Sequence, residues 1–444
     1  MNVLLSIEQK DLVRVASECA SLRSFYDAIE IRVVQKFSVE EEDFLRLLHV
    51  PILMKVEDLS LLSSCSVVPW MIDIPVWFRD QLGWVRDLFP SVPVQGSLHL
   101  SEAILSYDMI EENQAFDSIK IAAMTRNTKE ALSVMRFLVR YASSCRLTCI
   151  AMGEHAQWSR IVSAALGSYL TYTCLSGEPT APGQLDLKIA HERFSLSRIS
   201  RDTKLFGLIG DPVDSSVSDY THTRMLRSFG VDGVYVKIPV ALCELHECVS
   251  LLEKLSFVGL SVTTPLKEQI VGKPVNTVRW RYGHQEVCNT DAPALLDALH
   301  DHIRLKGVPV LVLGAGSVAK AVIPMLIEQG ADVTVWNRTY EHAEALRSDF
   351  GVSVLPVLSC DHFFVVINTT SFWTEHPSFL DQRSVSLFAE YCYPQESTML
   401  RYARSVGIQV ISGKDLWKRQ AAKQFHWWCS FEEQACRFFF DRMI

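Results

Sequence analysis

The stretch that decides the fold reads Val310-Leu311-Val312-Leu313-Gly314-Ala315-Gly316-Ser317-Val318-Ala319-Lys320-Ala321-Val322. An apolar strand runs into a GxGxxA turn, and an apolar helix follows. Gly314 permits the tight turn, Gly316 lets the backbone approach a pyrophosphate, and Ala319 is small enough for the helix to pack on the strand. The N–H groups of the first helical turn then face the phosphates. The pattern predicts a dinucleotide-binding α/β unit; a glycine turn in an unrelated α/β domain is the alternative.

The next predicted strand, residues 332–336, ends in Asn337-Arg338-Thr339. An NAD site usually places Asp or Glu at this strand end, where the carboxylate binds the ribose 2′-hydroxyl. A cation and two neutral hydrogen-bonding groups suit a 2′-phosphate instead. We therefore predict NADP(H) as the cofactor, held by Gly314, Ala315, Gly316, Ser317, Val318, Ala319, Asn337, Arg338 and Thr339.

The first 190 residues alternate short apolar runs with longer mixed stretches. The runs that predict strands are residues 28–34, 51–56, 70–74, 93–98, 118–123 and 147–152. Between the last two, residues 128–141 have apolar side chains at helical spacing. Strands separated by helix-length segments indicate a parallel sheet. Six to eight such units can close into a barrel, at the small end of that fold's size range.

Composition excludes several classes of protein. The 444 residues correspond to two to four domains, and the net charge of −8 gives no electrostatic footprint for nucleic acid. The 12 cysteines include no CxxC pair and match no common zinc pattern, so we expect reduced thiols, no metal site and a cytoplasmic location. No apolar run is long enough to span a membrane, and the first residues lack the basic region of a signal peptide. No feature predicts the oligomeric state.

Polar loops precede the glycine-rich turn. They contain Lys267 in the stretch 261–268, Asn276, and Asp291 in the stretch 289–291. Loops rich in Asn, Thr, Lys and Asp can bind a polyhydroxylated acid through directed hydrogen bonds. Without further context, Lys267 and Asp291 would be surface residues.

These motifs together resemble the shikimate dehydrogenase family over residues 203–444. The stretch 210–218 looks like that family's substrate loop, in which Ser216 and Ser218 would hold the substrate carboxylate. The resemblance implies reversible hydride transfer between NADPH and C3 of 3-dehydroshikimate, with Lys267 as the proton donor and Asp291 holding it. It also implies substrate contacts at Thr263, Asn276, Tyr393 and Gln420. Gly413 would be one further cofactor contact. Ser215 and Ser261 stand where the family usually has histidine and asparagine.

Lys120 lies inside the apolar run Ile119-Lys120-Ile121-Ala122. A lysine in a buried strand is costly unless its pKa falls or it finds a partner. Pointing into a barrel, such a lysine with a depressed pKa is a candidate Schiff-base nucleophile. A lysine on the solvent side of an edge strand is the alternative that the local sequence alone favours.

The surroundings of Lys120 resemble the type I 3-dehydroquinate dehydratase family over residues 1–190. This resemblance implies an imine between Lys120 and the C3 ketone of 3-dehydroquinate, with His99 as the general acid and base. An ordinary polar residue at a strand end is the alternative for His99. The remaining substrate contacts implied are Glu30, Arg32, Lys55, Arg160, Thr180 and Gln184. Val34 and Lys55 stand where the family usually has aspartate and arginine.

The order of the two modules resembles fused dehydratase–dehydrogenase enzymes of aromatic amino-acid biosynthesis. We predict an N-terminal (β/α)8-type barrel, a substrate-binding α/β domain and a Rossmann domain. The expected boundaries are a barrel at 1–190, a linker at 191–202, a substrate domain at 203–300 completed by 413–444, and a dinucleotide domain at 301–412. Two alternatives remain: a dehydrogenase with a weakened barrel, suggested by Val34 and Lys55, and a ligand-sensing regulator without activity. Quinate as a second substrate and channelling between the sites stay open.

Overall fold

The computed structural model describes residues 2–64, 66–359, 362–370, 380 and 384–443. Its contacts divide the chain into two compact units. The first unit comprises residues 1–208 and 218–258, and the second comprises residues 209–217 and 259–444.

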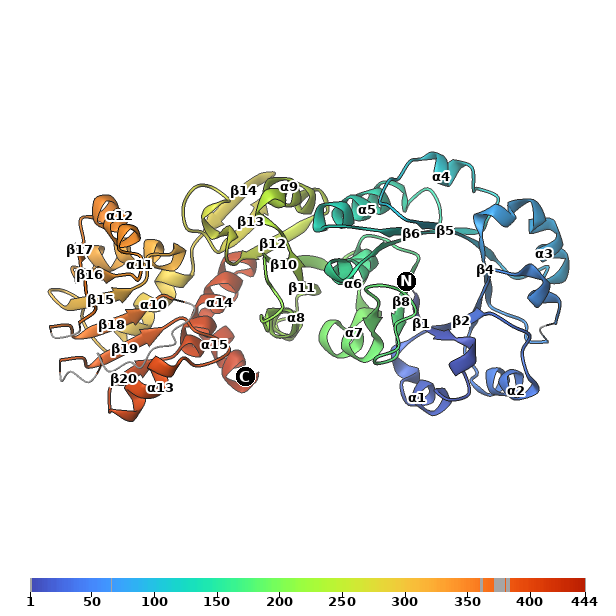
Figure 1. Ribbon diagram of the computed structural model, residues 1–444. Helices are drawn as coiled ribbons and strands as arrows, with labels where there is room; N and C mark the ends of the chain where they lie inside the picture. The colour runs from blue at the N-terminus through green and yellow to red at the C-terminus, as the bar shows by residue number, and fades with distance from the viewer. Residues whose placement is uncertain (1, 65, 360–361, 371–379, 381–383, 444) are drawn as a thin grey trace. The chain divides into compact units, whose positions relative to one another are not determined.

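A curled parallel sheet forms the core of the first unit, with helices on its outer side (Figure 1). Its strands are β1 (Asn2–Glu8), β2 (Ala28–Val33), β3 (Ile52–Val56), β4 (Met71–Pro75), β5 (Val94–Leu100), β6 (Ser118–Met124), β7 (Leu147–Met152), β8 (Leu170–Cys174) and β9 (Leu185–Asp186). The helices are α1 (Ala16–Ser21), α2 (Val39–Leu47), α3 (Leu82–Leu88), α4 (Asp108–Glu111), α5 (Thr128–Tyr141), α6 (Gln157–Ala165) and α7 (Leu187–Phe194). Several connections between these strands include short 3-10 turns, so the barrel needs few residues for its size.

Strand pairing runs in the order β7-β6-β5-β4-β3-β2-β1-β8-β9. Strand β7, at one end of this series, meets β8, next to the other end, where the Tyr169 amide donates to the Leu147 carbonyl, at 2.8 Å, and the Leu170 amide donates to Thr148 Oγ1, at 3.1 Å. The predicted parallel barrel is therefore confirmed, with a seam between β7 and β8. The sequence analysis did not identify β1 and β8, because β1 starts at the chain end and β8 reads Leu-Thr-Tyr-Thr-Cys, without an apolar run.

Every second side chain of a strand points into the barrel, because successive side chains point to opposite faces. The inward side chains of neighbouring strands therefore form layers, of which two are described here. The lower layer is apolar and includes Leu4, Leu53, Met71, Leu170 and Tyr172. Two residues further along the same strands the inward side chains are polar. Strand register aligns Lys55 with Asp73, Asp73 with Gln95, and Ser97 with Lys120. The fold therefore gathers charged side chains above an apolar floor.

The rest of the first unit contains β10 (Lys204–Gly210) as far as Leu208, α8 (Ser218–Ser228), β11 (Gly233–Pro239) and α9 (Leu245–Lys254). Residues 191–202, which the sequence suggests as a linker, hold the end of α7 and a 3-10 turn over Leu196–Arg198. Helix α5 contacts α9, and Thr128 Oγ1 on α5 donates to the Pro239 carbonyl of β11.

In the second unit, β12 (Phe257–Val262), from Gly259 onward, pairs antiparallel with β13 (Thr277–Arg281), which pairs antiparallel with β14 (His284–Cys288). A six-stranded parallel sheet follows in the order β17-β16-β15-β18-β19-β20. Its strands are β15 (Pro309–Leu313), β16 (Asp332–Trp336), β17 (Ser353–Val354), β18 (Val365–Asn368), β19 (Leu387–Glu390) and β20 (Gln409–Ile411). The helices are α10 (Asp291–His300), α11 (Ser317–Glu328), α12 (Tyr340–Phe350), α13 (Thr398–Ser405), α14 (Gly413–Cys429) and α15 (Glu433–Met443).

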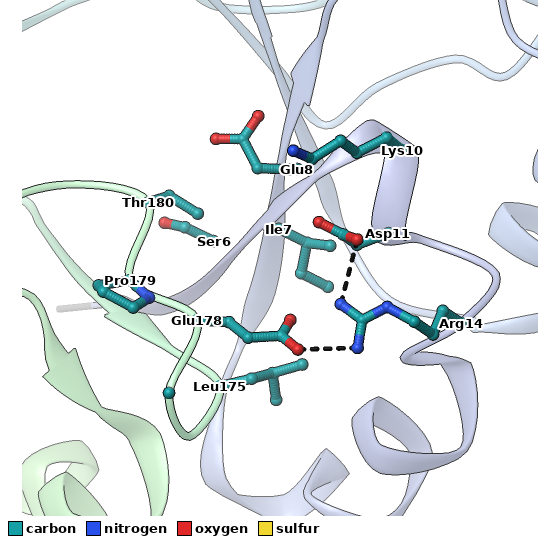
Figure 2. A pocket seen from close by; sticks show the side chains of 11 residues that line it. Ser6, Ile7, Glu8, Lys10, Asp11, Arg14, Leu175, Glu178, Pro179 and Thr180 are labelled. Atoms are coloured by element: carbon teal, nitrogen blue, oxygen red, sulfur yellow. Dashed lines mark ion pairs between the residues drawn. The ribbon is translucent and has the colours of Figure 1, made fainter.

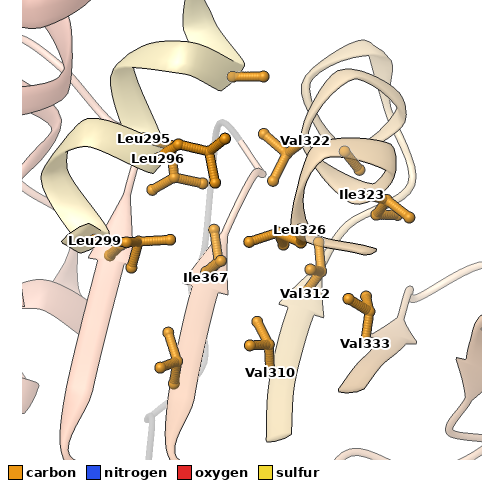
Figure 3. Packing of buried hydrophobic residues seen from close by; sticks show 14 of the residues in the cluster. Leu295, Leu296, Leu299, Val310, Val312, Val322, Ile323, Leu326, Val333 and Ile367 are labelled. Carbon is orange, nitrogen blue, oxygen red and sulfur yellow. The ribbon is translucent and has the colours of Figure 1, made fainter. Parts of the chain in front are cut away.

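Apolar packing fixes the dinucleotide-binding turn. Leu295 and Leu299 on α10 pack with Val322 and Leu326 on α11 above Val312 of β15 (Figure 3). All five side chains are essentially inaccessible to solvent, so the strand, the turn and the helix are held together by burial. None of the helices in the described residues combines the length and apolar character needed to cross a membrane.

Candidate active sites

The barrel encloses a cavity of about 180 Å³ at the carboxyl ends of its strands. This is the end at which barrel enzymes bind their substrates. Every residue that the sequence analysis assigned to the barrel site lines this cavity: Glu30, Arg32, Lys55, His99, Lys120, Arg160, Thr180 and Gln184. The structure thus brings together side chains from β2, β3, β5, β6, α6 and the loop after β8.

Lys120 is buried at the centre of this site, with only 4% of its surface exposed. Its Nζ makes an ion pair with Asp73 Oδ2 and lies 3.4 Å from Glu30 Oε2. The Tyr172 ring lies 4.7 Å from the same nitrogen. The solvent-exposed alternative for Lys120 is therefore wrong, because the barrel turns this strand face inward.

Of the two conditions for burying this lysine, a lowered pKa or a partner, the structure meets the second, and the pKa of Lys120 is raised. Burial disfavours the ammonium, but the carboxylates of Asp73 and Glu30 outweigh it and hold the pKa of Lys120 above its usual range. Burial would raise the pKa of Asp73, yet Lys120, Lys55 and two hydrogen bonds keep it below its ordinary value. The resting pair is therefore an ammonium and a carboxylate.

Asp73 is a functional candidate that the sequence analysis missed. Its carboxylate is completely buried and accepts hydrogen bonds from Ser97 Oγ and from Gln95 Nε2, the latter at 3.1 Å. Gln95 Nε2 also donates to the Tyr172 hydroxyl at 3.1 Å. The sequence does contain a signal for Asp73: an acid inside the apolar run Met71-Ile72-Asp73-Ile74 needs a buried partner, just as Lys120 does.

His99 lies at the end of β5, where its ring opens onto the cavity. Partial burial and the neighbouring cations Lys55 and Lys120 lower the pKa of His99 to about 4. The imidazole is therefore neutral near pH 7 and can accept a proton. Burial, followed by the charges of Lys120 and Arg32, likewise lowers the pKa of Lys55.

A loop closes the cavity, held by two arginines. Arg160 Nε donates to the Gly183 carbonyl at 2.7 Å, and its Nη2 donates to the Pro182 carbonyl at 3.0 Å. Arg32 Nη1 donates to the Thr180 carbonyl at 2.6 Å. Gly183 approaches the backbone so closely that a Cβ would lie 2.2 Å from the Gly153 carbonyl oxygen, which explains why glycine occupies this position.

Two buried polar atoms in the cavity wall, Ser6 Oγ and Arg32 Nε, make no hydrogen bond within the described residues. Since buried polar atoms are normally paired, both are available to a polar ligand. A second pocket, of about 300 Å³, adjoins Ser6 and Thr180 (Figure 2). There Arg14 links Glu178 of the closing loop, at 2.8 Å, to Asp11, at 3.1 Å.

The second candidate site lies in the second unit, around Lys267 and Asp291. Lys267 is in a 3-10 turn over Leu266–Glu268, and Asp291 begins α10. Lys267 Nζ lies 2.6 Å from Asp291 Oδ2, and both side chains are largely buried. Asn289 Oδ1 accepts the Asp291 amide at 3.0 Å, and the Tyr391 hydroxyl donates to the Asp291 carbonyl at 3.1 Å. The predicted lysine–aspartate pair is therefore formed and rigidly supported.

An amide network beside this pair includes the predicted contacts Asn276 and Gln420. Asn276 Nδ2 donates to Thr290 Oγ1 at 2.9 Å and to Gln420 Oε1 at 3.4 Å. Gln424, which the sequence analysis did not single out, accepts from Ser261 Oγ at 3.2 Å and donates to the Asn276 carbonyl at 3.2 Å. Its position one helical turn after Gln420 was the available signal.

The remaining predicted residues are distributed as follows. Thr263 follows β12 and pairs with Ile209 through its amide, at 2.9 Å. Tyr393 stacks on Trp417 with 5.3 Å between ring centroids. Gly413 begins α14, and a Cβ there would lie 1.9 Å from the Cys392 carbonyl oxygen. Ser216 is half-buried in the second unit, whereas Ser218 is buried at the start of α8 in the first unit.

The glycine-rich turn fits a dinucleotide. Gly314 has φ of 109°, and a Cβ there would lie 2.6 Å from Thr369 Oγ1. Gly316 has nothing within 4 Å of a Cβ position, so a phosphate can approach its backbone. Among the described residues, no side chain caps the first amides of α11, which begins at Ser317. The predicted Arg338 lies exposed after β16, next to Asn337 and Thr339.

Three family models match consecutive parts of the chain. The model of type I 3-dehydroquinase matches residues 95–201, and that of the shikimate dehydrogenase substrate binding domain matches residues 208–302. The model of shikimate / quinate 5-dehydrogenase matches residues 297–370. Both predicted resemblances are thus confirmed, in the predicted order.

Individual proteins agree with these matches. The chain is 29% identical over 389 residues to the shikimate biosynthesis protein AroDE of Chlamydia muridarum, covering 82% of this chain and 79% of that protein. It is 34% identical to a shikimate dehydrogenase (NADP(+)) of Acidiphilium cryptum, covering 52% of this chain and 92% of that protein. The crystal structure of shikimate dehydrogenase from Aquifex aeolicus superimposes with a TM-score of 0.50 at 30% identity, covering 54% of this chain and 98% of that one. The chain therefore belongs to the shikimate dehydrogenase family and has a type I 3-dehydroquinase domain in front of the dehydrogenase domains.

Proposed function

We propose that this chain catalyses two consecutive reactions at separate sites. The Lys120 site dehydrates 3-dehydroquinate to 3-dehydroshikimate, and the Lys267 site reduces 3-dehydroshikimate to shikimate with NADPH. The observation that supports this most is the convergence of a buried lysine, a neutral histidine and a group of cations in one barrel cavity, in a chain that also holds a lysine–aspartate pair.

In the dehydratase site, Lys120 reacts as the free amine, so its ammonium, which Asp73 and Glu30 stabilise, first loses a proton to solvent. Its nitrogen then attacks the C3 ketone, and loss of water leaves a protonated imine that acidifies the C2 proton. His99 accepts that proton and returns one to the C1 hydroxyl, which departs as water. Hydrolysis of the imine releases the product and regenerates Lys120. Lys55, Arg32 and Arg160 supply positive charge for the substrate carboxylate.

In the dehydrogenase site, NADPH supplies the hydride when it is bound. The backbone from Gly314 to Ala319 and the Arg338 side chain are the groups that would hold it. Lys267 donates a proton to the C3 oxygen as the carbonyl is reduced, and Asp291 holds the ammonium in place at 2.6 Å. Asn276 and Gln420 are placed to orient substrate hydroxyls.

A coupled assay tests the proposal. The purified chain, given 3-dehydroquinate and NADPH and no other enzyme, is expected to consume NADPH and form shikimate. If 3-dehydroshikimate supports NADPH oxidation but 3-dehydroquinate does not, the barrel is weakened, and only the dehydrogenase half works. If neither substrate is converted, the proposal is wrong and a ligand-sensing role becomes the better reading.

Asp73→Asn is expected to move the acidic limb of the dehydratase pH profile to lower pH. Without the carboxylate, the charged form of Lys120 loses its closest stabilising partner, so its pKa falls and the amine becomes free at lower pH. One opposite charge at contact distance corresponds to a shift of about 1–3 pH units. The measurement is kcat/KM for 3-dehydroquinate against pH, with Asp58→Asn, an exposed residue directly before the 3-10 turn over Leu59–Ser64, as the control. A limb that stays in place or moves upward contradicts the assigned role of Asp73.

Arg338→Ala is expected to raise KM for NADP⁺ by about 10- to 100-fold, the effect of losing one or two charge-assisted hydrogen bonds. KM for shikimate should stay within about twofold, because Arg338 is assigned to the 2′-phosphate of the cofactor and not to the shikimate site. Arg347→Ala, an exposed arginine on α12, is the matched control. Equal loss of NADP⁺ and NAD⁺ utilisation would exclude 2′-phosphate recognition by Arg338.

We propose domain boundaries at residues 190, 202 and 300, with 413–444 returning to the substrate domain and 301–412 binding the dinucleotide. The binding partners of the chain would be small-molecule substrates, and we expect it to bind neither nucleic acid nor a membrane. The absence of any paired cysteine motif in the sequence supports a reducing, cytoplasmic compartment.

A further inference from the structure

A buried amide on β5 connects the ion pair of the dehydratase site with the apolar floor of the barrel. Gln95 is inaccessible to solvent, and strand register places it beside Asp73 of β4 and Ser118 of β6. Its Nε2 lies 3.1 Å from Asp73 Oδ2 and 3.1 Å from the hydroxyl of Tyr172, which belongs to the floor. Because an amide nitrogen carries two donors, Gln95 can make both hydrogen bonds at once.

Asp73 therefore has more partners than the lysine that it faces. Lys120 Nζ and Gln95 Nε2 both donate to its Oδ2, and Ser97 Oγ donates to its Oδ1. A carboxylate only accepts hydrogen bonds, so the group that Gln95 turns toward it must be NH2 and not the amide oxygen. Each donor stabilises the carboxylate and partly offsets its charge, which weakens its attraction for the ammonium.

The strength of this attraction matters for the chemistry, because only the free amine of Lys120 can attack a ketone. A carboxylate that holds the ammonium too strongly leaves little free amine at a given pH. We propose that Gln95 is a positioning residue of the dehydratase reaction, which shares the charge of Asp73 and limits how tightly that carboxylate holds the Lys120 ammonium. Tyr172 anchors the same amide nitrogen. This inference rests on the proposed function.

Replacing Gln95 with a neutral residue leaves the other charged and titratable groups around this ion pair unchanged. They come from β2, β3, β5, α6 and β8, and they are Glu30, Arg32, Lys55, His99, Arg160 and Tyr172. Glu30 Oε2, at 3.4 Å from Lys120 Nζ, remains as the second carboxylate. A shift of the pH profile in such a variant therefore reports the hydrogen bond to Asp73.

The test is kcat/KM of the full chain for 3-dehydroquinate, measured against pH. Gln95→Met keeps the side-chain volume and removes both donors. We expect it to move the acidic limb to higher pH by about 0.5–1 pH unit, the scale of one hydrogen bond to an ionised group. On the limb this is a decrease of about 3- to 10-fold, whereas the plateau at high pH should stay within about twofold. Added to Asp73→Asn, the substitution should cause no further shift, because no charge is left to share.

Thr173→Val is the matched control. It also removes a buried hydrogen-bonding group, next to Tyr172 in the chain, but Thr173 Oγ1 donates to the Leu4 carbonyl, at 2.8 Å, and the limb should stay in place. Gln95→Leu covers the case in which the methionine variant folds poorly.

Three results would overturn the inference. The first is a limb that stays in place or moves to lower pH, and the second is a shift that persists in the Asp73→Asn background. The third is loss of the fold in both Gln95 variants, which would make Gln95 a structural residue. A wild-type chain without dehydratase activity would instead overturn the proposed function, and this inference with it.

Discussion

Replacing Lys120 with alanine is expected to lower the dehydratase kcat by at least about 10⁴-fold, equivalent to about 5 kcal/mol in the barrier. The reason is chemical, because Lys120 supplies the amine that pairs with two carboxylates in the cavity that His99 also lines. Reduction with borohydride in the presence of 3-dehydroquinate should add the mass of the reduced adduct to the peptide containing Lys120 in the wild type and not in the variant.

In Lys120→Ala, a loss of folding stability must be distinguished from the loss of the reactive amine. Removing one partner of a buried ion pair costs about 3–5 kcal/mol, and Lys120→Ala leaves Asp73 and Glu30 uncompensated. Lys120→Arg keeps the positive charge but has no nucleophilic amine, so it should fold and still fail to form the imine. Dehydrogenase activity of the same sample reports folding of the rest of the chain. An active Lys120→Arg enzyme would contradict imine chemistry.

Replacing Lys267 with alanine should lower the dehydrogenase kcat by about 10²- to 10⁴-fold, the usual contribution of a positioned proton donor. NADPH affinity should change by less than about twofold, because the cofactor is held by the turn after β15 and by Arg338. Tryptophan fluorescence quenching by NADPH measures binding directly. The dehydratase rate should remain at the wild-type level, since Lys120 and Lys267 lie in different units.

Two results would contradict this assignment of Lys267. The first is an unchanged kcat, which would remove the residue from proton transfer. The second is loss of NADPH binding in step with kcat, which would make Lys267 a cofactor contact. Asp291→Asn is the companion variant, and it should reduce kcat less than Lys267→Ala because Asp291 acts through the lysine.

The sequence predicted most of what local pattern determines. Strand β7, strand β16 and helix α5 fall at the predicted residues, because each is a continuous apolar or amphipathic run with clear ends. The glycine-rich turn was recognisable for the same reason, since its requirements are confined to neighbouring positions. The residues that line the barrel cavity came instead from the family resemblance, which sums evidence across distant strands.

What the sequence did not predict depends on contacts between strands far apart in the chain. The direction of the Lys120 pKa shift reverses because Asp73, 47 residues earlier, meets it across the barrel. A local sequence pattern cannot show a contact between residues so far apart in the chain. Strand β8 was missed because its threonines replace apolar residues, and its inward Tyr172 is recognisable only once the barrel closes. Gln424 contacts Asn276, 148 residues away, and no local pattern predicts that contact; the spacing from Gln420 indicates only the helix face.

The most direct test of two independent sites on one chain is complementation between Lys120→Arg and Lys267→Ala. Each variant alone, given 3-dehydroquinate and NADPH, should form little or no shikimate, because each lacks one of the two steps. Mixed in equal amounts, they should restore NADPH oxidation, with 3-dehydroshikimate passing from one protein to the other through solution. A mixture as inactive as its components, although both proteins are folded, would contradict the account, and so would a single variant that completes both steps.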